Sequence, residues 1–392
     1  MPEILLSQRF KPEIGGSIAW LSELAAQWPR PLEIVTHLYP GSSEQEVTSR
    51  AMPKVTRANI QMQNWGLDSL DSLAKYSRMV TAVNRLCRFS AVNIVYGTHL
   101  VPEIFSMLPL KAIYGSKLKL VSFAHGEEFV AYSMSRQLRF YQNLSFKVVD
   151  LVIANSQHTK SLIQDIDGKA PVVVIEPGVD CKLFSFCQDS RVSWRDTHRI
   201  DDGEIVLLTV GRLEKRKNHR KVIQAVSELL KKGVKVKYYI AGSGPEEPEI
   251  RSLVDSLGLQ AEVLMLGRIS EQEKIRALAG CDVFIMPAIN TGDDFEGYGI
   301  VFLEAAASGK PCISGKSGGQ SEAVSDGVTG LLVDGNSVSE ISQAIARLAE
   351  NEILRNSMGR EARNFAAQRN WQIVAEKTVL AIREYVVADS SL

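Results

Sequence analysis

The sequence predicts an α/β protein built from two doubly wound parallel sheets, and three observations support this fold class. The chain has 392 residues, enough for two or three domains of roughly 150 residues each. Short apolar runs rich in β-branched residues alternate with longer helical patterns, which is typical of parallel strands joined by helices. This alternating series stops near the middle of the chain and then starts again. The restart indicates two Rossmann-like domains.

Strands are expected wherever a run is short and apolar almost throughout. In the first half these runs are residues 3–7, 32–37, 93–96, 118–124, 151–154 and 172–175. In the second half they are residues 205–210, 236–241, 263–266, 283–286, 311–314 and 330–333. Helical periodicity lies between them, for example at 219–232 and 246–257, and it fills the tail from 336 to 387.

The domain boundary is expected between residues 178 and 203. This stretch loses periodicity and contains the polar run DSRVSWRDTHRIDDG. We therefore assign residues 1–182 to an N-terminal domain and residues 183–370 to a C-terminal domain.

Composition excludes several classes of protein. Lys and Arg total 45, as do Asp and Glu, whereas a dedicated nucleic-acid binder is usually basic. The five cysteines are odd in number and form no C-x-x-C pair, so we expect reduced thiols rather than disulfides or a zinc site. The N-terminus has no signal-peptide pattern and no apolar run is long enough to span a membrane. These features predict a cytoplasmic protein.

A glycine pair follows the first expected strand. The loop KPEIGGS carries Gly15 and Gly16 just before a helix. Glycines let a backbone approach a ligand closely, and a helix N-terminus favours an anion. A tight turn would explain the same residues.

Two cations follow the first strand of the second half. In TVGRLEKRKNHR, Arg212 and Lys217 come just after the carboxyl end of a strand, where doubly wound sheets bind ligands. Guanidinium and ammonium groups suit a diphosphate. A solvated basic loop is the alternative, because Lys215, Arg216 and Arg220 are also basic.

The segment EGYGIVFLE combines a glycine turn, a helix start and two carboxylates, Glu296 and Glu304. Backbone N–H groups and the positive end of a helix can hold a phosphate and sugar hydroxyls. Carboxylates on either side can accept hydrogen bonds from hydroxyl groups. A second glycine turn, Ser317-Gly318-Gly319, leads into the next helix. The residues expected at the first turn are Gly297, Tyr298, Gly299, Ile300 and Val301.

These motifs, in this order, resemble the family 4 retaining glycosyltransferases of GT-B architecture. EGYGIVFLE resembles the family's E-x7-E signature, GRLEKRK its Arg/Lys clamp, and AGSGP at 241–245 its next strand end. GG at 15–16, AHGE at 124–127, ANS at 154–156 and EPGVD at 176–180 extend the likeness through the first half. Within this family the sequence resembles bacterial phosphatidylinositol-mannoside-type mannosyltransferases and polysaccharide-assembly enzymes.

The resemblance implies a role for each donor-site residue. Arg212 and Lys217 would bind the diphosphate of a nucleotide sugar and stabilise the departing nucleotide, with no metal or other cofactor. Glu304 would hold the ribose, Glu296 the hexose, and His125 would lie against the donor sugar. Backbone groups of 299–301, with those of 15–16, would complete the phosphate cradle. The resemblance also implies that the two domains face a cleft and that helix 371–392 crosses back to the N-terminal domain.

The resemblance implies retention of configuration, and no nucleophile is evident in the sequence. We expect front-face attack, with the leaving phosphate taking the acceptor's proton. The acidic run Gly292-Asp293-Asp294 invites a metal site, but a polar loop is the interpretation we favour.

The donor is predicted from two residues that follow the expected strand at 263–266. Glu271 and Lys274 match positions where some guanine-using family members carry an acid and a lysine, which favours GDP-mannose. UDP-glucose or another UDP-hexose is the alternative, since these residues would also cap and solvate a helix.

A glycan or lipid-linked acceptor is expected at the N-terminal domain. The segment 67–89 mixes apolar residues with Lys75, Arg78, Arg85 and Arg88. It would either touch an anionic membrane peripherally at its inner face or pack as an ordinary amphipathic helix on the sheet. Arg136 and Arg139 would face an acceptor phosphate or solvent.

Rival classes are a nucleotide-sugar epimerase, a phosphorylase and a non-catalytic nucleotide-sugar binder. A non-catalytic binder would be expected to have lost one of Arg212, Lys217, Glu296 or His125, and all four are present.

Overall fold

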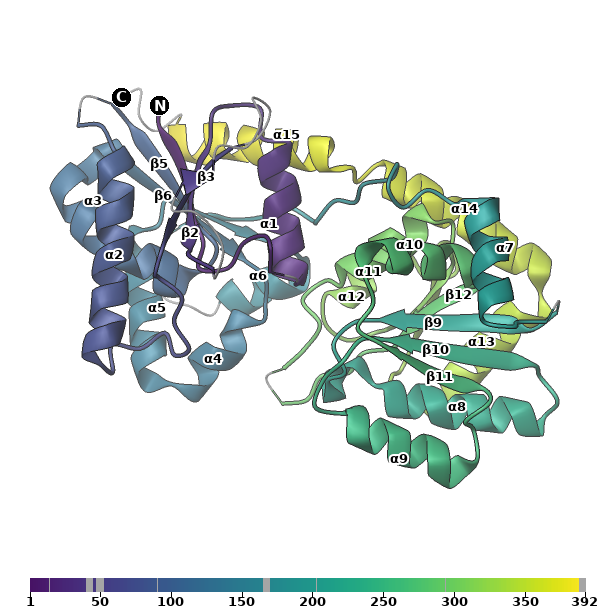
Figure 1. The fold of residues 1–392 in the computed structure, drawn as a ribbon. Helices are drawn as coiled ribbons and strands as arrows, with labels where there is room; N and C mark the ends of the chain where they lie inside the picture. Colours follow the sequence, from purple (N-terminus) through teal and green to yellow (C-terminus); the bar gives the residue numbers. More distant parts are fainter. Residues whose placement is uncertain are drawn as a thin grey trace. The chain divides into compact units, whose positions relative to one another are not determined.

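The computed structural model describes residues 1–13, 15–39, 45–46, 53–89, 91–164, 170–201, 203–292 and 294–387 (Figure 1). The chain divides into two compact units. The N-terminal unit comprises Met1–Pro177 and Trp371–Leu392, and the C-terminal unit comprises Gly178–Asn370. The predicted boundary, at residue 182, lies slightly later in the chain.

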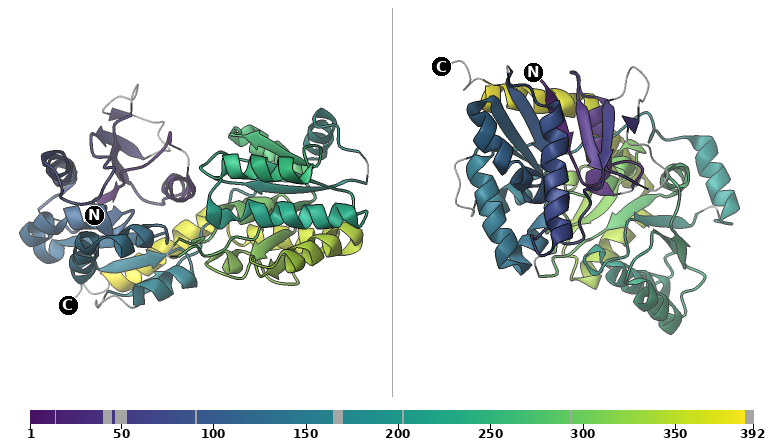
Figure 2. Two further views of the ribbon diagram at one scale, coloured as in Figure 1. Left: turned by 90° about the horizontal axis from the view of Figure 1, so that it is seen from below. Right: turned by 60° about the vertical axis from the view of Figure 1, so that its left-hand side comes forward.

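The N-terminal unit is built on one sheet of order β3-β4-β2-β1-β5-β6-β7-β8. All described neighbours pair in parallel except β3 with β4. Every residue of β5 and β6 is buried, because helices cover both faces (Figures 1 and 2). The strands are β1 (Glu3–Leu6), β2 (Glu33–His37), β3 (Gln45–Glu46), β4 (Lys54–Ala58), β5 (Asn93–Gly97), β6 (Leu118–Ala124), β7 (Leu151–Ala154) and β8 (Val172–Val174).

Helices of the N-terminal unit pack on this sheet through apolar stripes. In α2, for example, Tyr76, Met79 and Val83 are buried at helical spacing against Ile4 and Val95 of the central strands. The last helix, α15, contacts α1 within this unit. The helices are α1 (Gly16–Ala26), α2 (Leu70–Leu86), α3 (Leu108–Tyr114), α4 (Glu128–Met134), α5 (Arg136–Val148), α6 (Gln157–Gln164) and α15 (Trp371–Ile382).

The C-terminal unit has a parallel sheet of order β11-β10-β9-β12-β13-β14. Its strands are β9 (Ile205–Val210), β10 (Val236–Ala241), β11 (Val263–Gly267), β12 (Val283–Met286), β13 (Cys312–Gly315) and β14 (Gly330–Val333). Its helices are α7 (Gln188–Thr197), α8 (His219–Lys231), α9 (Glu247–Leu257), α10 (Glu271–Gly280), α11 (Ile300–Ala307), α12 (Gln320–Ala323), α13 (Val338–Glu350) and α14 (Glu352–Ala367).

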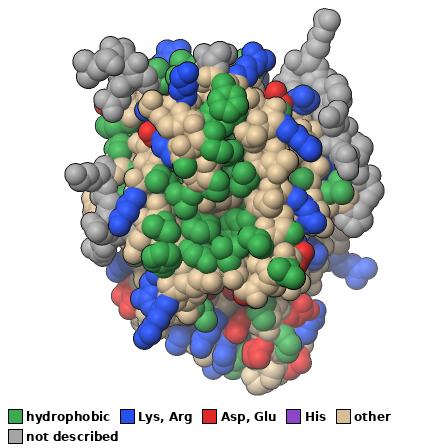
Figure 3. Space-filling model, turned by 90° about the vertical axis from the view of Figure 1, so that its left-hand side faces the viewer, with side chains coloured by type: hydrophobic (Ala, Val, Ile, Leu, Met, Phe, Trp, Pro, Cys, Tyr) green, Lys and Arg blue, Asp and Glu red, His purple; other side chains and the backbone are tan. Residues whose placement is uncertain are grey.

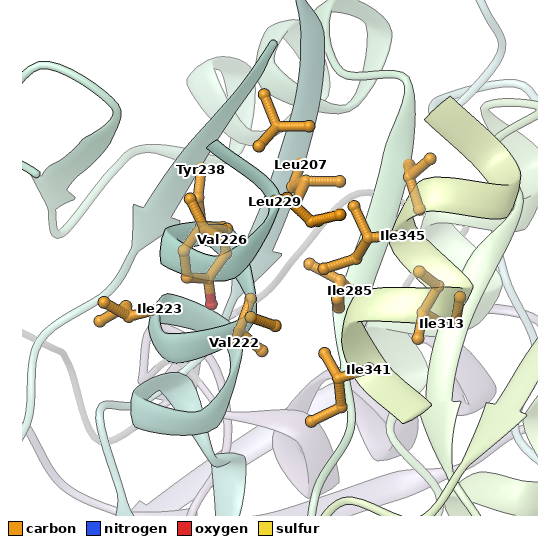
Figure 4. Close-up of a cluster of buried hydrophobic side chains, with 14 of the residues drawn as sticks. Leu207, Val222, Ile223, Val226, Leu229, Tyr238, Ile285, Ile313, Ile341 and Ile345 are labelled. Atoms are coloured by element: carbon orange, nitrogen blue, oxygen red, sulfur yellow. The ribbon is translucent and has the colours of Figure 1, made fainter. Parts of the chain in front are cut away.

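One core of the C-terminal unit lies between the sheet and helices α8 and α13 (Figure 4). Val226 and Leu229 of α8 and Ile345 of α13 converge on Leu207 and Ile285 from the strands, and all are essentially inaccessible to solvent. This packing buries the apolar stripes that predicted both helices.

All the predicted strands are confirmed, but the structure adds elements that the pattern did not indicate. β4 and β3 extend one edge of the N-terminal sheet. The stretch 178–203 was expected to be irregular, and this was wrong, because it contains α7. Burial of Trp194 against Gly280 and Tyr239 fixes that otherwise polar helix to the C-terminal unit.

The strand order identifies one switch point in each sheet. Neighbouring connections run in opposite directions on either side of the β1–β5 pair in the first sheet and the β9–β12 pair in the second. Doubly wound sheets bind ligands at the carboxyl ends of such strands. Each unit therefore has one favoured position for a site.

Two further expectations concern the surface and the thiols. No helix in the described ranges is long and apolar enough to cross a membrane. The five cysteines are free.

Segment 67–89 was expected either to touch a membrane or to pack on the sheet, and the buried stripe of α2 does pack on the sheet. Leu70 and Leu73 at the start of α2, however, are 86% and 55% exposed. Figure 3 shows one face of the N-terminal unit, on which hydrophobic side chains gather with Lys and Arg around them.

Candidate functional site

The turn after β9 is held by the turn after β10. Gly211 N donates to Ala241 O at 2.9 Å, and Leu213 N donates to Ser243 O at 3.1 Å. A Cβ on Gly242 would overlap the Gly211 carbonyl oxygen, so only glycine fits. The AGSGP turn after β10 thus holds the GRLEKRK turn after β9 in place through backbone hydrogen bonds.

Lys217 is fixed where this turn meets the loop after β12. Ile289 N donates to Arg216 O at 2.8 Å. The Asn218 side-chain amide donates to Pro287 O at 2.9 Å and to Gly335 O at 2.7 Å. These bonds anchor both flanks of Lys217 at the carboxyl ends of β9 and β12, the switch point of the sheet.

Glu296 is the buried carboxylate at this point. Its Oε2 atom accepts from Lys217 Nζ and, at 2.6 Å, from a terminal nitrogen of Arg216. Burial acts to raise the pKa of Glu296, but the charges of Lys217 and Arg216 outweigh it and hold that pKa below its usual value. The result is a buried cluster with two cations on one carboxylate.

The second glycine turn supports Glu296 from its backbone side. Gly319 N donates to Glu296 O at 2.9 Å. Gly318 has φ +70, and a Cβ there would lie 2.7 Å from the same oxygen. Gly318 is therefore required by the packing of this turn against Glu296.

Helix α11 begins next to Glu296. Gly299 caps it with φ +82, leaving the first backbone N–H groups of the helix without i−4 partners. One turn inside, Glu304 is buried and its Oε1 accepts from Lys274 Nζ at 2.8 Å. Its Oε2 has no hydrogen-bond partner within the described part of the chain. Burial, opposed by Lys274, raises the pKa of Glu304.

The six charged donor residues predicted in the C-terminal unit fall into two contacting pairs and two exposed positions. Lys217 contacts Glu296, and Lys274 contacts Glu304. The Arg212 side chain is 75% exposed and pairs with Glu214 at 3.1 Å. Glu271, at the first residue of α10, is also exposed.

Arg216 is the site residue that sequence reasoning missed, having counted it toward a solvated loop. It is largely buried and contacts the carboxylates of Glu214 at 2.8 Å, Asp294 at 3.0 Å and Glu296 at 2.6 Å. Its carboxylate partners at 294 and 296 lie about eighty residues along the chain, so local sequence gives no signal for them. Of the acidic run, Asp293 lies outside the described residues, and Asp294 pairs with Arg216. Across the described ranges no group of three acidic, histidine or cysteine side chains could hold a metal ion.

The N-terminal unit positions its predicted residues after β1 and β6. Gly15 precedes α1 with extended backbone, and a Cβ on Gly16 would meet nothing within 4 Å. Neither glycine is required by the described chain itself, unlike Gly299 and Gly318. Arg136 and Arg139 are exposed on α5.

His125 follows β6 and is buried. Its backbone N donates to Glu128 Oε1 at 2.9 Å, and its carbonyl accepts from Asn155 at 2.7 Å, which accounts for the ANS motif. Its ring meets Trp20 edge-on at 4.7 Å between centroids. Burial and the neighbouring His99 hold the pKa of His125 well below its usual value. Neither ring nitrogen finds a hydrogen-bond partner among the residues described, so the neutral ring is available to a ligand.

Two family models match successive parts of the chain. The model for glycosyltransferase family 4 matches residues 14–183, and that for glycosyl transferases group 1 matches residues 190–365. A GDP-mannose-dependent alpha-(1-6)-phosphatidylinositol monomannoside mannosyltransferase of Mycolicibacterium smegmatis is 29% identical over 375 residues, 94% of each chain. A GDP-mannose-dependent monoacylated alpha-(1-6)-phosphatidylinositol monomannoside mannosyltransferase of Corynebacterium glutamicum is 33% identical over 264 residues, covering 66% of this chain and 68% of that one.

The solved structure of HepE from Anabaena, in complex with UDP and glucose, has the same fold. Its TM-score is 0.79 at 20% identity, and the match covers 98% of this chain and 100% of HepE. Fold, motifs and relatives agree: the chain belongs to the family 4 glycosyltransferases and has the GT-B fold.

Proposed function

We propose that this glycosyltransferase moves mannose from GDP-mannose to a glycan or lipid-linked acceptor, with retention of configuration, in polysaccharide or glycolipid assembly. The observation that carries the proposal is the buried Lys217–Glu296–Arg216 cluster at the switch point of the C-terminal sheet. Lys217 and Arg216 are cations of the kind that bind a diphosphate, and their carboxylate partners hold them where a nucleoside diphosphate would bind. Names of the mycobacterial and corynebacterial relatives favour GDP-mannose as the donor.

The cluster suggests how the donor would be taken up. The diphosphate would replace Glu296 as the partner of Lys217, with Arg212 swinging in from its exposed position. Glu296 would then accept hydrogen bonds from the hexose hydroxyls. Stabilising the charge that develops on the departing nucleotide is the main catalytic effect expected of these cations.

The N-terminus of α11 offers groups that would bind a phosphate and the ribose of the nucleotide. Free backbone N–H groups of residues 299–301 would face a phosphate, next to Gly297 and Tyr298. The unpartnered Glu304 Oε2 would accept from a ribose hydroxyl. In the N-terminal unit, Gly15 and Gly16 are proposed to approach the phosphates, and His125 the sugar.

The choice of nucleobase has a separate test. Lys274 contacts Glu304, so reading guanine with Glu271 and Lys274 would require that lysine to leave its carboxylate. UDP-glucose remains the alternative donor, and the HepE complex with UDP and glucose supports it. To distinguish the two donors, nucleotide release from GDP-mannose and from UDP-glucose is measured side by side, with a membrane-lipid extract as acceptor. We expect faster release of GDP, and a preference for UDP-glucose would overturn the donor assignment.

Retention and metal independence are further parts of the proposal. They are supported by cations placed to balance a diphosphate and by the family resemblance. NMR of the first product should show an α-linkage from the α-configured donor. Chelation by EDTA should leave turnover unchanged. Trapping a covalent glycosyl-enzyme would contradict front-face attack.

The rival classes predict different products. An epimerase would convert the donor sugar without an acceptor, and a phosphorylase would need free phosphate. A non-catalytic binder would release no nucleotide under any condition. Acceptor-dependent transfer of labelled hexose, together with nucleotide release, excludes all three.

We also propose peripheral membrane contact through the N-terminal unit. Leu70 and Leu73 of α2 are exposed, and so are Arg78 and Arg85 on the same helix and Arg88 just after it. An apolar edge with flanking cations suits an anionic lipid surface. Co-sedimentation with phosphatidylglycerol vesicles should fall when Leu70 and Leu73 become Ser. The matched control is Ile353→Ser, an equally exposed position on α14, and an equal loss there would contradict the assignment.

A further inference from the structure

The N-terminal unit has a cavity at its own switch point, between the ends of β1 and β5. Its volume is about 30 Å³, close to the space one water molecule fills. Gln8 and Arg9 follow β1, and His99 follows β5. Further lining side chains are Ser17, Trp65 and Glu103. None of these was singled out by the sequence motifs.

His99 and Glu103 form a buried ion pair in this cavity. Nδ1 of His99 lies 3.4 Å from Glu103 Oε2, and Glu103 Oε1 accepts from Gln8 N at 3.0 Å. The indole of Trp65 lies against the imidazole at 5.2 Å between ring centroids. Burial acts to lower the pKa of His99, but the neighbouring Glu103 carboxylate raises it to about 9. The pair is therefore charged at neutral pH.

Three polar atoms of the cavity lining are buried and unsatisfied. Gln8 Nε2, His99 Nε2 and Glu103 Oε2 have no hydrogen-bond partner in the part of the chain that the structure describes. Leaving a buried donor or acceptor unpaired costs roughly 1–3 kcal/mol, and more for a charged group. Three such atoms lining one cavity indicate that a polar group occupies it in solution.

Charge and shape restrict what that group can be. One imidazolium and one carboxylate cancel, so the pair favours a neutral group that both donates and accepts over a phosphate. A hydroxyl group does both. The cavity also has an apolar wall of Ile18, Leu21 and Trp65, which suits the C–H surface beside a hydroxyl. Its size admits a hydroxyl or hydroxymethyl arm.

We propose that Gln8, His99 and Glu103 bind one hydroxyl arm of the acceptor, a sugar or cyclitol, and so help to select it. The hydroxyl donates to Glu103 Oε2 and accepts from His99 Nε2 or Gln8 Nε2. His99 also lies 5.6 Å from the His125 ring, centroid to centroid, which places the arm close to a residue assigned to the donor sugar. This inference rests on the proposed function for the identity of its ligand.

Imidazole NMR on the full chain tests the pocket directly. The protein has six histidines, and long-range ¹H–¹⁵N spectra resolve the ring nitrogens of each. The probes are myo-inositol and methyl α-D-mannopyranoside, titrated separately. We expect a saturable shift of the His99 nitrogens with at least one probe and no shift of His158, which lies on α6. Absence of a His99 shift with both probes means that the pocket holds water only and overturns the proposal.

Two variants separate binding from damage to the fold. Glu103→Gln keeps the size and removes the charge, and should weaken the probe's affinity about tenfold. Ser17→Leu narrows the cavity from a partly exposed helix position, without changing the ion pair, and should also weaken binding. Wild-type affinity in both variants contradicts the pocket. Nucleotide release by the wild-type protein reports on the proposed function separately, because the titration needs no donor.

Discussion

The two units share a fold but treat buried charge differently at their switch points. In the C-terminal unit, Glu296 pairs with Lys217 and Arg216, and Glu304 pairs with Lys274. In the N-terminal unit, by contrast, both members of the His99–Glu103 pair keep an unsatisfied atom within the described structure, whereas among the C-terminal residues just named only Glu304 does, at Oε2.

This difference separates two ways of preparing a site. Paired charges hold one another in place, so a ligand must exchange with a protein group, and removing one partner leaves a buried charge uncompensated. Unsatisfied groups gain a hydrogen-bond partner only when a ligand binds. Their removal therefore lowers ligand affinity more than it lowers folding stability. Substitutions in the two units should therefore affect stability and activity in different proportions.

The largest expected effect comes from breaking the paired cluster. Glu296→Gln leaves buried Lys217 without its carboxylate and removes one of the three carboxylates that contact Arg216. We expect a loss of about 3–5 kcal/mol of unfolding free energy and of all transfer activity. Urea denaturation measures the first and nucleotide release the second. Glu249→Gln, at an exposed position of α9, is the control, and an equally small effect in both variants would contradict the account.

The next effect is a pH dependence that originates in the N-terminal unit. The folded pKa of His99, about 9, lies above its unfolded value of about 6.5. The extra stability is therefore fully present below about pH 6.5 and is lost as pH rises through about 9, up to about 3 kcal/mol in total. Denaturation of wild type and His99→Gln across this range should show a smaller loss in the variant. If stability falls equally with pH in the wild type and in His99→Gln, His99 is not the cause of the pH dependence.

A structural ion pair provides a sharper contrast with the donor cluster. Asp282 accepts from Arg191 at 2.7 Å, from Arg195 at 3.2 Å and from Val206 N at 2.8 Å, tying α7 to the sheet. Asp282→Asn should cost about 2 kcal/mol while turnover per folded molecule stays at the wild-type level. Reduced turnover of the folded protein would show that this pair also serves the site.

The smallest expected change in stability comes from the glycines. Gly16→Ala places a methyl in open space at the start of α1, so stability should stay equal or rise by about 0.5 kcal/mol. Transfer should nevertheless fall about tenfold if a phosphate approaches this backbone closely. Gly318→Ala, at φ +70 beside Glu296, should lose stability as well as activity. Full activity in Gly16→Ala would remove the glycine pair from the donor site.

Sequence reasoning succeeded where the signal is local. Strands buried on both faces read as short apolar runs, so β5, β6 and the central strands of the C-terminal sheet were found. Strand β4, next to the edge strand β3, has alternating exposure and gives no such run. Helix α7 was missed because one buried tryptophan, Trp194, fixes an otherwise polar segment.

The site shows the same limit at the level of single residues. Motifs located Lys217, Glu296 and Glu304, whose neighbours in the chain carry the pattern. Arg216 could not be found, because its partner Glu296 is eighty positions away. The His99–Glu103 pair was overlooked because it lies in GTHLVPE, which reads as the start of an apolar helix.

The most direct test of the central claim is donor turnover by the Lys217→Met variant beside the wild type. Both are incubated with GDP-mannose and a membrane-lipid extract, and released GDP and transferred mannose are quantified together. The account predicts equal amounts of GDP and transferred mannose from the wild type and neither from the variant, with the variant shown to be folded. Wild-type turnover in Lys217→Met would contradict it, as would a wild-type protein that transfers no hexose from either GDP-mannose or UDP-glucose.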